Sequence, residues 1–187
     1  KRNRIMDYSQ YLKTMSSIND DLIEKAKKIK LLILDVDGVM TDGGIIISKD
    51  GSESKRFFAQ DGHGLVLLKN LNIELAIISG RHSESVEYRA KELGFNIIIQ
   101  NSRDKLGDFN KHFADKYQFD EVCFVGDDIV DIELMKKVGL SITVPNANYN
   151  KVLMSSDWVT PRLGGFGAVR DTCDLIILAK DHGQQSK

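Results

Sequence analysis

The residues of this sequence with the clearest chemical potential are Asp35 and Asp37, which follow four apolar residues at 31–34. Such a run is typical of a central parallel strand that is buried on both faces. Side chains at positions i and i+2 lie on the same face of a strand, so both carboxylates project together where this strand ends. Adjacent carboxylates repel each other unless a cation, a shared proton or a reacting substrate compensates them. The alternative is that these aspartates only begin a polar loop.

Other polar residues also follow the carboxyl ends of predicted strands. They are Ser79, Gly80 and Arg81, then Lys105, and then Asp127, Asp128 and Asp131. In open α/β sheets, ligands bind at the carboxyl ends of the strands. We therefore expect one acidic pocket with hydrogen-bond donors around it.

Carboxylates beside donors for a dianion are typical of phosphoryl transfer. Mg²⁺ is the usual cation where carboxylates and phosphate oxygens meet, and Ser79, the Gly80 N–H and Lys105 are donors suited to phosphate. Unaided hydrolysis of a phosphate monoester is so slow that enzymes accelerate it up to about 10²¹-fold. A carboxylate nucleophile splits the reaction into two easier steps by forming an aspartyl-phosphate intermediate. A second carboxylate then protonates the leaving alcohol and activates water. Alternatively, Ser79 only caps the following helix and Lys105 is a surface lysine.

The elements that would position these residues alternate between strands and helices. The pattern predicts strands over 31–34, 74–78, 95–99, 122–125 and 140–144, a short edge strand over 157–160, and helices over 19–29, 65–71, 83–93, 104–117, 129–138 and 168–179. This alternation predicts an α/β fold with a doubly wound, Rossmann-like parallel sheet. A hairpin over 43–59, with Asp50-Gly51 at its turn, interrupts the alternation. Its apolar residues Ile45 to Ile47 either form an oligomer contact or pack on the hairpin itself.

Length and composition indicate one domain, 1–187, with a loose N-terminal arm over 1–15 and a C-terminal tail and helix over 161–187. A net charge of −1 argues against a nucleic-acid partner. No apolar run reaches the roughly 20 residues of a membrane span, and no signal peptide opens the chain, so we expect no membrane partner. Cys123 and Cys173 lie in apolar patterns, which favours free thiols and a cytoplasmic location.

Four segments, taken in order, resemble the motifs of the haloacid dehalogenase superfamily of Mg²⁺-dependent phosphohydrolases. They are Asp35-Val-Asp-Gly-Val, Ile78-Ser-Gly-Arg81, Lys105 and Gly126-Asp-Asp-Ile-Val-Asp131. The resemblance extends from residue 31 to about residue 144. Because the gaps between the motifs are too short for a cap domain, the chain is similar to the cap-less branch of that superfamily.

This resemblance implies roles for the site residues. Asp35 is expected to be the nucleophile and Asp37 the general acid and base. The expected magnesium ligands are the Asp35 carboxylate, the Asp37 backbone carbonyl and Asp127, with Asp128 or Asp131 supporting them. The expected phosphoryl ligands are Ser79, Gly80 and Lys105.

Three further segments, 35–43, 58–64 and 164–170, are similar to cap-less phosphatases that act on an eight-carbon 3-deoxy sugar acid phosphate of the lipopolysaccharide inner core. The resemblance implies a small sugar-acid phosphate as substrate and a homotetramer with shared active sites, in which a neighbour's tail closes each site. Related enzymes act on nine-carbon acids, so the length of the substrate stays open. Phe166 and Asn101-Ser102 depart from the pattern and leave the details of sugar recognition open.

Four residues are candidate contacts for the sugar acid: Arg81, Asp61, His63 and Arg170. Arg81 suits a carboxylate because its guanidinium binds such groups through two parallel hydrogen bonds. The alternatives are that Arg81 is a surface residue, that His63 belongs to a glycine-rich turn, and that Arg170 is a solvated helix residue.

Three other functions remain to be weighed. A signalling receiver domain also places aspartates around Mg²⁺, but it needs an aspartate after the strand over 95–99, where this chain has Gln100-Asn101. A catalytically silent oligomeric module would have no reason to keep all four of Asp35, Asp37, Lys105 and Asp127. A phosphotransferase or mutase would use the same chemistry, but a cap-less site open to water favours hydrolysis.

Overall fold

The computed structural model describes residues 18–147 and 150–184, and the predicted N-terminal arm lies outside this part. Its centre is a six-stranded parallel sheet in the order β5-β4-β1-β6-β7-β8. The strands are β1 (Leu31–Leu34), β4 (Glu74–Ile78), β5 (Ile97–Ile99), β6 (Val122–Val125), β7 (Leu140–Thr143) and β8 (Trp158–Val159). The chain extends the sheet first from β1 to β5 and then, on the other side, from β6 to β8. This creates a switch point between β1 and β6, where ligands bind in such sheets.

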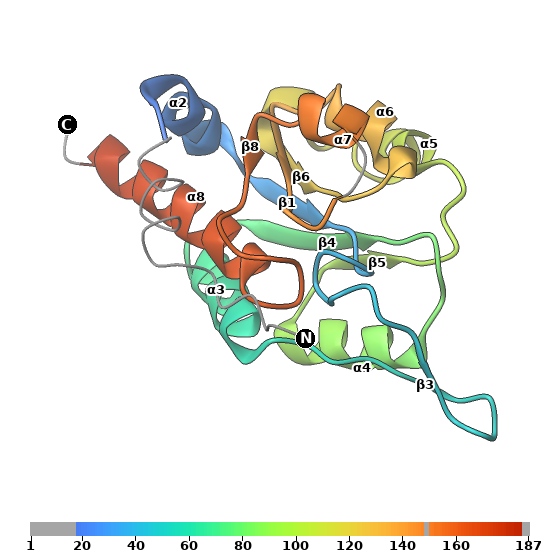
Figure 1. Cartoon of the computed structure of the whole chain (residues 1–187). Helices are drawn as coiled ribbons and strands as arrows, with labels where there is room; N and C mark the ends of the chain where they lie inside the picture. Colours follow the sequence, from blue (N-terminus) through green and yellow to red (C-terminus); the bar gives the residue numbers. More distant parts are fainter. Residues whose placement is uncertain (1–17, 148–149, 185–187) are drawn as a thin grey trace.

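Helices cover both faces of the sheet (Figure 1). They are α2 (Asp20–Lys28), α3 (Ala59–Asn70), α4 (Glu84–Leu93), α5 (Lys105–His112), α6 (Ile132–Met135), α7 (Asn150–Met154) and α8 (Ala168–Gln184). Leu32 and Leu34 of β1 pack in a core shared with α2, α3, α4 and α8, whereas Leu31 and Ile33 pack in a second core with α5 and α6. The alternating side chains of one buried strand thus serve both cores. The predicted doubly wound α/β fold is confirmed.

Local sequence signals explain where several elements begin and end. The Asn19 side chain caps α2 by accepting a hydrogen bond from the backbone N–H of Leu22 at 2.9 Å. Gly94 ends α4 in the left-handed conformation with φ of 72°, as a C-terminal glycine does. The predicted bounds of β1, β4 and β6 are confirmed, because each strand is a short run of apolar residues.

The prediction for α3 was wrong at its N-terminal end. The predicted helix begins at residue 65, but α3 begins at Ala59 and contains the glycine-rich segment. The reason lies in tertiary packing: a Cβ atom on Gly62 would lie 2.3 Å from an Arg89 nitrogen, and one on Gly64 would lie 3.0 Å from the Cys173 Cβ. These glycines allow α4 and α8 to approach α3 closely, which offsets their low helix propensity.

Two other helices are shorter than predicted, and one was not predicted. Helix α5 ends at His112 rather than near residue 117, although single turns continue beyond it. The predicted helix over 129–138 is a 3₁₀ turn, Ile129–Asp131, followed by α6. Its first turn is tight because the Asp131 carboxylate turns back to the N–H groups of Asp127 and Asp128. Helix α7 has too few residues for a clear apolar period.

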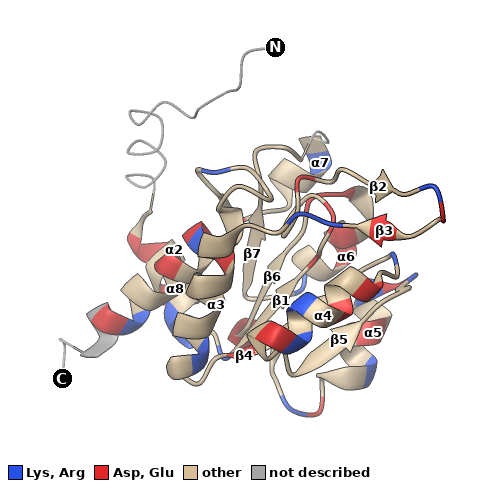
Figure 2. Ribbon diagram, turned by 90° about the horizontal axis from the view of Figure 1, so that it is seen from below, with Lys and Arg blue, Asp and Glu red and all other residues tan. Residues whose placement is uncertain are grey.

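The predicted hairpin is present as the antiparallel pair β2 (Ile46–Ile47) and β3 (Glu53–Ser54). It projects from the body of the molecule (Figures 1 and 2). Ile46 and Ile47 keep 55% and 68% of their surface exposed, so they do not pack on the hairpin in the described part of this chain. That exposure leaves the predicted oligomer contact as the remaining interpretation.

The last helix, α8, packs against both α2 and α3. Cys123 and Cys173 are free and buried, as predicted. Among the helices in the described part of the chain, none has the length and apolar character needed to cross a membrane.

Candidate active site

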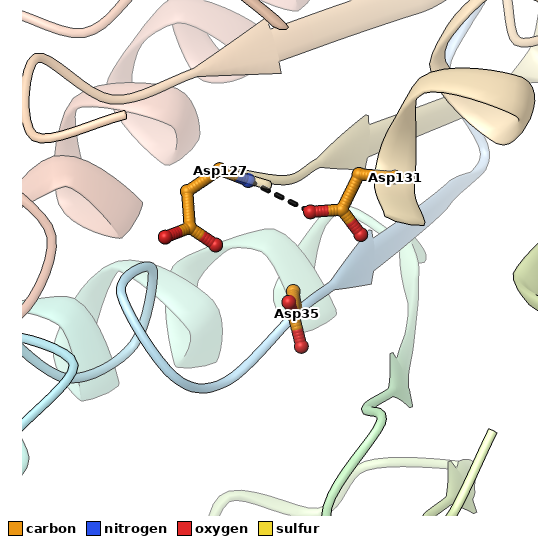
Figure 3. Close-up of side chains that lie close together, drawn as sticks. All are labelled: Asp35, Asp127 and Asp131. Atoms are coloured by element: carbon orange, nitrogen blue, oxygen red, sulfur yellow. Dashed lines mark hydrogen bonds between the residues drawn. The ribbon is translucent and has the colours of Figure 1, made fainter. Parts of the chain in front are cut away.

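Three carboxylates gather at the switch point of the sheet: those of Asp35, Asp127 and Asp131 (Figure 3). Each offers one oxygen, and these oxygens all lie within 4.8 Å of one another. Asp35 and Asp131 are buried, and Asp127 is half-buried. We call these three residues the acidic cluster. Three acids this close require positive charge nearby.

The parallel register of β1 and β6 brings the cluster together. Leu34 pairs with Val125, and the Asp35 N–H donates to the Val125 carbonyl at 3.0 Å, so the residues after both strands meet. Asp131 then folds back, and its Oδ2 accepts hydrogen bonds from the N–H groups of Asp127 and Asp128 at 2.9 and 3.0 Å. The 3₁₀ turn therefore fixes one wall of the site.

Gly38 is required where the chain turns away from the acidic cluster. Its φ is 91°, a conformation that strongly favours glycine. A Cβ atom there would lie 2.0 Å from Oδ2 of Asp127. The turn and the close approach to Asp127 therefore each demand a residue without a side chain.

Lys105 supplies the one cation in direct contact with the acidic cluster among the described residues. It is the first residue of α5 and is buried, with its Nζ 2.9 Å from Asp35 Oδ2 and in contact with Asp131 Oδ1. Asp104 caps α5 by accepting from the Gly107 N–H at 2.9 Å, which sets the direction of the first turn. The alternative that Lys105 is a surface residue is therefore wrong.

One lysine does not balance three acids, and the pKa values reflect this. Burial, together with the charges of Asp35 and Asp131, raises the pKa of Asp127 to about 8, against the lowering effect of Lys105. Burial also raises the pKa of Asp35 to about 6, although Lys105 opposes the shift. A cation that binds to these two carboxyl groups would therefore displace protons from them.

The acidic cluster fits a hard divalent cation. Oδ1 of Asp127 is buried and, within the described part of the chain, has no hydrogen-bond partner. Such an orphaned carboxylate oxygen is costly unless a ligand meets it. Oxygen ligands of this kind suit Mg²⁺. Of the two acids predicted to support the metal ligands, Asp131 belongs to this cluster, whereas the Asp128 carboxylate accepts from the Ile129 N–H at 2.7 Å.

Asp37 lies at the rim of the site and is surrounded by ionic partners. Lys55 places its Nζ 2.5 Å from Asp37 Oδ1 and 2.9 Å from Glu53 Oε1. Arg81 reaches both acids, with Nε 3.6 Å from Asp37 and a terminal nitrogen 2.6 Å from Glu53. Burial lowers the pKa of Lys55, but its hydrogen bond with Asp37 and its ion pair with Glu53 outweigh burial and raise the pKa. The structure thus brings together two predicted site residues, Asp37 and Arg81, whose pairing was not predicted.

Ser79 and Gly80 form the loop after β4 on the side of β5. Ser79 is buried, and its backbone bonds to Ile99 and Ser102 at 2.9 and 3.0 Å hold the loop against the next strand. The helix that follows has its N-cap at Ser83 rather than at Ser79. The alternative that Ser79 is only a helix cap is therefore wrong.

The remaining predicted contacts lie between α3 and α8. Asp61 is buried and its Oδ1 accepts from the Arg170 N–H at 2.8 Å, which caps the first turn of α8. The Arg170 side chain donates to Asp174 at 2.7 Å, and His63 is an exposed residue of α3. The first of these hydrogen bonds joins α8 to α3 and the second lies within α8, so neither reaches the acidic cluster.

Sequence reasoning missed Lys55 and Glu53. Both come from the hairpin, which drew attention only for its apolar residues. The sequence feature that could have indicated them is their spacing: residues 53 and 55 lie on one face of a strand and carry opposite charges. Nothing in the sequence indicates that this face turns toward Asp37.

The fold and the acidic cluster define a class. The structure of a protein described as a haloacid dehalogenase superfamily (subfamily III A) hydrolase, from Legionella pneumophila, superposes with a TM-score of 0.81 at 42% identity, covering 88% of this chain and 91% of that one. This protein is therefore a member of the haloacid dehalogenase superfamily. No family model matches the chain.

Two further relatives narrow the assignment. The 3-deoxy-D-manno-octulosonate 8-phosphate phosphatase of Yersinia pestis is 41% identical over 178 residues, covering 94% of this chain and 95% of the relative. The structure of the Moraxella catarrhalis phosphatase, in complex with magnesium, phosphate and the sugar acid, has a TM-score of 0.83 at 40% identity and covers 90% of this chain and 97% of that one. The chain belongs to the family of 3-deoxy-D-manno-octulosonate 8-phosphate phosphatases.

Proposed function

We propose that this protein is a Mg²⁺-dependent phosphatase that releases inorganic phosphate from 3-deoxy-D-manno-octulosonate 8-phosphate, a step in the synthesis of the lipopolysaccharide inner core. The observation that carries the proposal is the acidic cluster with Lys105 in contact with two of its members. Membership of the phosphatase family supplies the class of substrate.

In the proposed reaction, Asp35 is the nucleophile. Its Oδ1 accepts from the Val36 N–H at 2.7 Å and its Oδ2 contacts Lys105, so both oxygens are held at the end of β1. Asp35 forms a bond to phosphorus as the bond to the sugar oxygen breaks, and Asp37 protonates that oxygen. Asp37 then takes a proton from the water molecule that hydrolyses the aspartyl-phosphate and frees inorganic phosphate.

The groups proposed to hold the cation are the Asp35 carboxylate, the Asp37 carbonyl and the Asp127 carboxylate. Asp128 or Asp131 is proposed to support them. When bound, Mg²⁺ would neutralise the acids and stabilise negative charge on the phosphoryl oxygens. Lys105, Ser79 and the Gly80 N–H are proposed to bind those oxygens. Lys105 also stabilises Asp131, whose carboxylate already accepts two backbone hydrogen bonds.

Substrate recognition is proposed to involve Arg81 at the rim. It is about half exposed and lies beside Asp37, so its guanidinium is available to the carboxylate of the sugar acid. Contacts from Asp61, His63 and Arg170 remain predictions, and a second subunit would have to bring them to the site.

We also infer a cytoplasmic homotetramer. The buried free thiols of Cys123 and Cys173 suit a reducing compartment. The exposed isoleucines of the hairpin, 45–47, form an apolar surface of the kind that subunit contacts cover. Sedimentation velocity of the wild type and of an Ile47→Ser variant tests the assembly, and a wild-type monomer would contradict it.

The function is tested by phosphate release from 3-deoxy-D-manno-octulosonate 8-phosphate and from nine-carbon 3-deoxy sugar acid 9-phosphates, with Mg²⁺ and with a chelator. Release from the eight-carbon acid that chelation abolishes is expected. A preference for a nine-carbon acid would keep the mechanism and change the substrate. No release from any of them by a folded protein would favour the silent oligomeric module.

A further inference from the structure

Lys55 is a charged residue that the fold buries next to the proposed general acid. It follows β3 directly, and its side chain is only 1% exposed. Removing an ammonium group from water costs several kcal/mol unless hydrogen-bonded anions compensate it. Asp37 and Glu53, at 2.5 and 2.9 Å from its Nζ, provide that compensation. Most of the hairpin is exposed, so this burial is a specific feature of its base.

The two oxygens of Asp37 have different surroundings. Lys55 contacts Oδ1, whereas Oδ2 lies 3.6 Å from Arg81 Nε and has no hydrogen-bond partner among the described residues. A single strong contact at Oδ1 restricts rotation of the carboxyl group. It leaves Oδ2 as the oxygen that can exchange a proton with the substrate.

Glu53 holds Lys55 from the opposite side. Its Oε1 contacts Lys55, and its Oε2 contacts Arg81 at 2.6 Å. The Glu53 carbonyl also accepts from the Ser85 hydroxyl of α4 at 3.1 Å, which ties the base of the hairpin to the body. The position of Lys55 is therefore set from both the backbone and the side chains.

We propose that Lys55, held by Glu53, is a positioning residue that fixes the Asp37 carboxyl for proton transfer to the leaving oxygen. The inference rests on the proposed function, because it takes Asp37 as the acid that protonates this oxygen while the bond from Asp35 to phosphorus forms. A misplaced acid slows the departure of a basic leaving group more than that of a group that leaves as a stable anion.

The test compares phenyl phosphate with p-nitrophenyl phosphate, which have similar shapes but leaving groups of different basicity. The kcat/KM reports the steps up to formation of the aspartyl-phosphate, so slow hydrolysis of that intermediate does not affect it. In Lys55→Met, kcat/KM for phenyl phosphate is expected to fall about 10- to 100-fold, a part of the 10²- to 10⁴-fold that a positioned acid contributes. For p-nitrophenyl phosphate we expect a fall of about threefold or less, since its leaving group needs little protonation.

The matched control is Arg56→Met. Arg56 is the next residue, is exposed, and pairs with Asp42 of the loop after β1 at 2.8 Å. Arg56→Met should leave the ratio of the two kcat/KM values at the wild-type level. Lys55→Arg keeps a cation, so its ratio should lie between those of Lys55→Met and the wild type. An equal fall for both substrates in Lys55→Met would overturn the proposal and assign Lys55 to anchoring the hairpin.

Circular dichroism and thermal unfolding show whether Lys55→Met folds. If it does not, Glu53→Gln removes one partner of Lys55 and should shift the same ratio in the same direction by a smaller factor; an unchanged ratio would overturn the proposal. A wild type that hydrolyses aryl phosphates but not the eight-carbon acid would overturn the proposed substrate alone. A wild type that hydrolyses neither would overturn both.

Discussion

Two regions of this molecule bury carboxylates, and they do so in different ways. The acidic cluster at the switch point holds three acids against one lysine. At the α3–α8 junction, which we define as Asp61, Arg162, Arg170 and Asp171, one acid caps a helix and the other accepts three hydrogen bonds from Arg162. The acidic cluster is short of positive charge. At the junction, Arg162 pairs with both oxygens of Asp171, and Asp61 keeps one oxygen, Oδ2, without a hydrogen-bond partner among the described residues.

This difference separates function from stability. The acids of the cluster share one lysine, and Oδ1 of Asp127 has no hydrogen-bond partner among the described residues, so these acids need a ligand. Acids that cap a helix or pair with an arginine take part in the packing of the chain and need no ligand. Substitutions in the acidic cluster should therefore affect turnover most, whereas substitutions in the junction should affect unfolding.

The largest effect is expected from Asp35→Asn. An amide cannot form the acyl-phosphate intermediate, so kcat for the sugar-acid phosphate should fall by about 10⁴-fold or more, as when other enzymes lose their nucleophile. The fold should remain, because asparagine has the same shape and one fewer charge in a crowded acidic site. Phosphate release measures the loss of kcat, and thermal unfolding shows whether the fold remains. Residual activity near the wild-type level would remove Asp35 from its proposed role.

The next effect in size is expected from Lys105→Met. The loss of this buried cation leaves Asp35 and Asp131 without their partner, and breaking such pairs typically costs about 3–5 kcal/mol of unfolding free energy. Denaturant unfolding should show this loss. Lys116→Met is the matched control. Lys116 is exposed and pairs with Glu74 at the surface, so its replacement should cost little unfolding free energy. Equal losses would contradict the distinction between the two lysines.

How far the sequence predicts these regions depends on how local their causes are. β1 and β6 follow from apolar runs, and the acids directly behind them lie at one sheet edge for that reason alone. The start of α3 could not be predicted, because Gly62 and Gly64 disfavour a helix locally and are accepted only where α4 and α8 press close. The burial of Lys55 depends in the same way on a hairpin that folds back onto Asp37.

The junction makes a prediction about pH. Burial raises the pKa of Asp61 to about 6, although the hydrogen bond from the Arg170 N–H opposes the shift. In the unfolded chain the pKa of an aspartate is about 3.9. Between these values the folded chain holds a proton that the unfolded chain has lost, so Asp61 makes the unfolding free energy fall as pH rises from about 4 to about 6. Asp61→Asn should remove this pH dependence. Above pH 6 its unfolding free energy should exceed that of the wild type by up to about 3 kcal/mol.

Urea unfolding at pH 4, 5, 6 and 7 measures this difference. Asp174→Asn is the control, because Asp174 is a partly exposed acid of α8 whose ion pair with Arg170 should contribute little to the unfolding free energy. A difference between Asp61→Asn and the wild type that stays constant with pH would contradict the assignment. A rise in KM for the sugar-acid phosphate in Asp61→Asn would instead support the predicted substrate contact.

The smallest effect is expected from Arg162→Lys. Arg162 binds one oxygen of Asp171 through two side-chain nitrogens and the other through its backbone N–H, and a lysine keeps the charge but not this forked contact. The unfolding free energy should fall by about 1 kcal/mol, the typical value of one hydrogen bond. Turnover should stay at the wild-type level, since the acidic cluster is untouched. A loss of activity larger than the loss of stability would show that the junction and the acidic cluster are coupled, and the separation of function from stability would then fail.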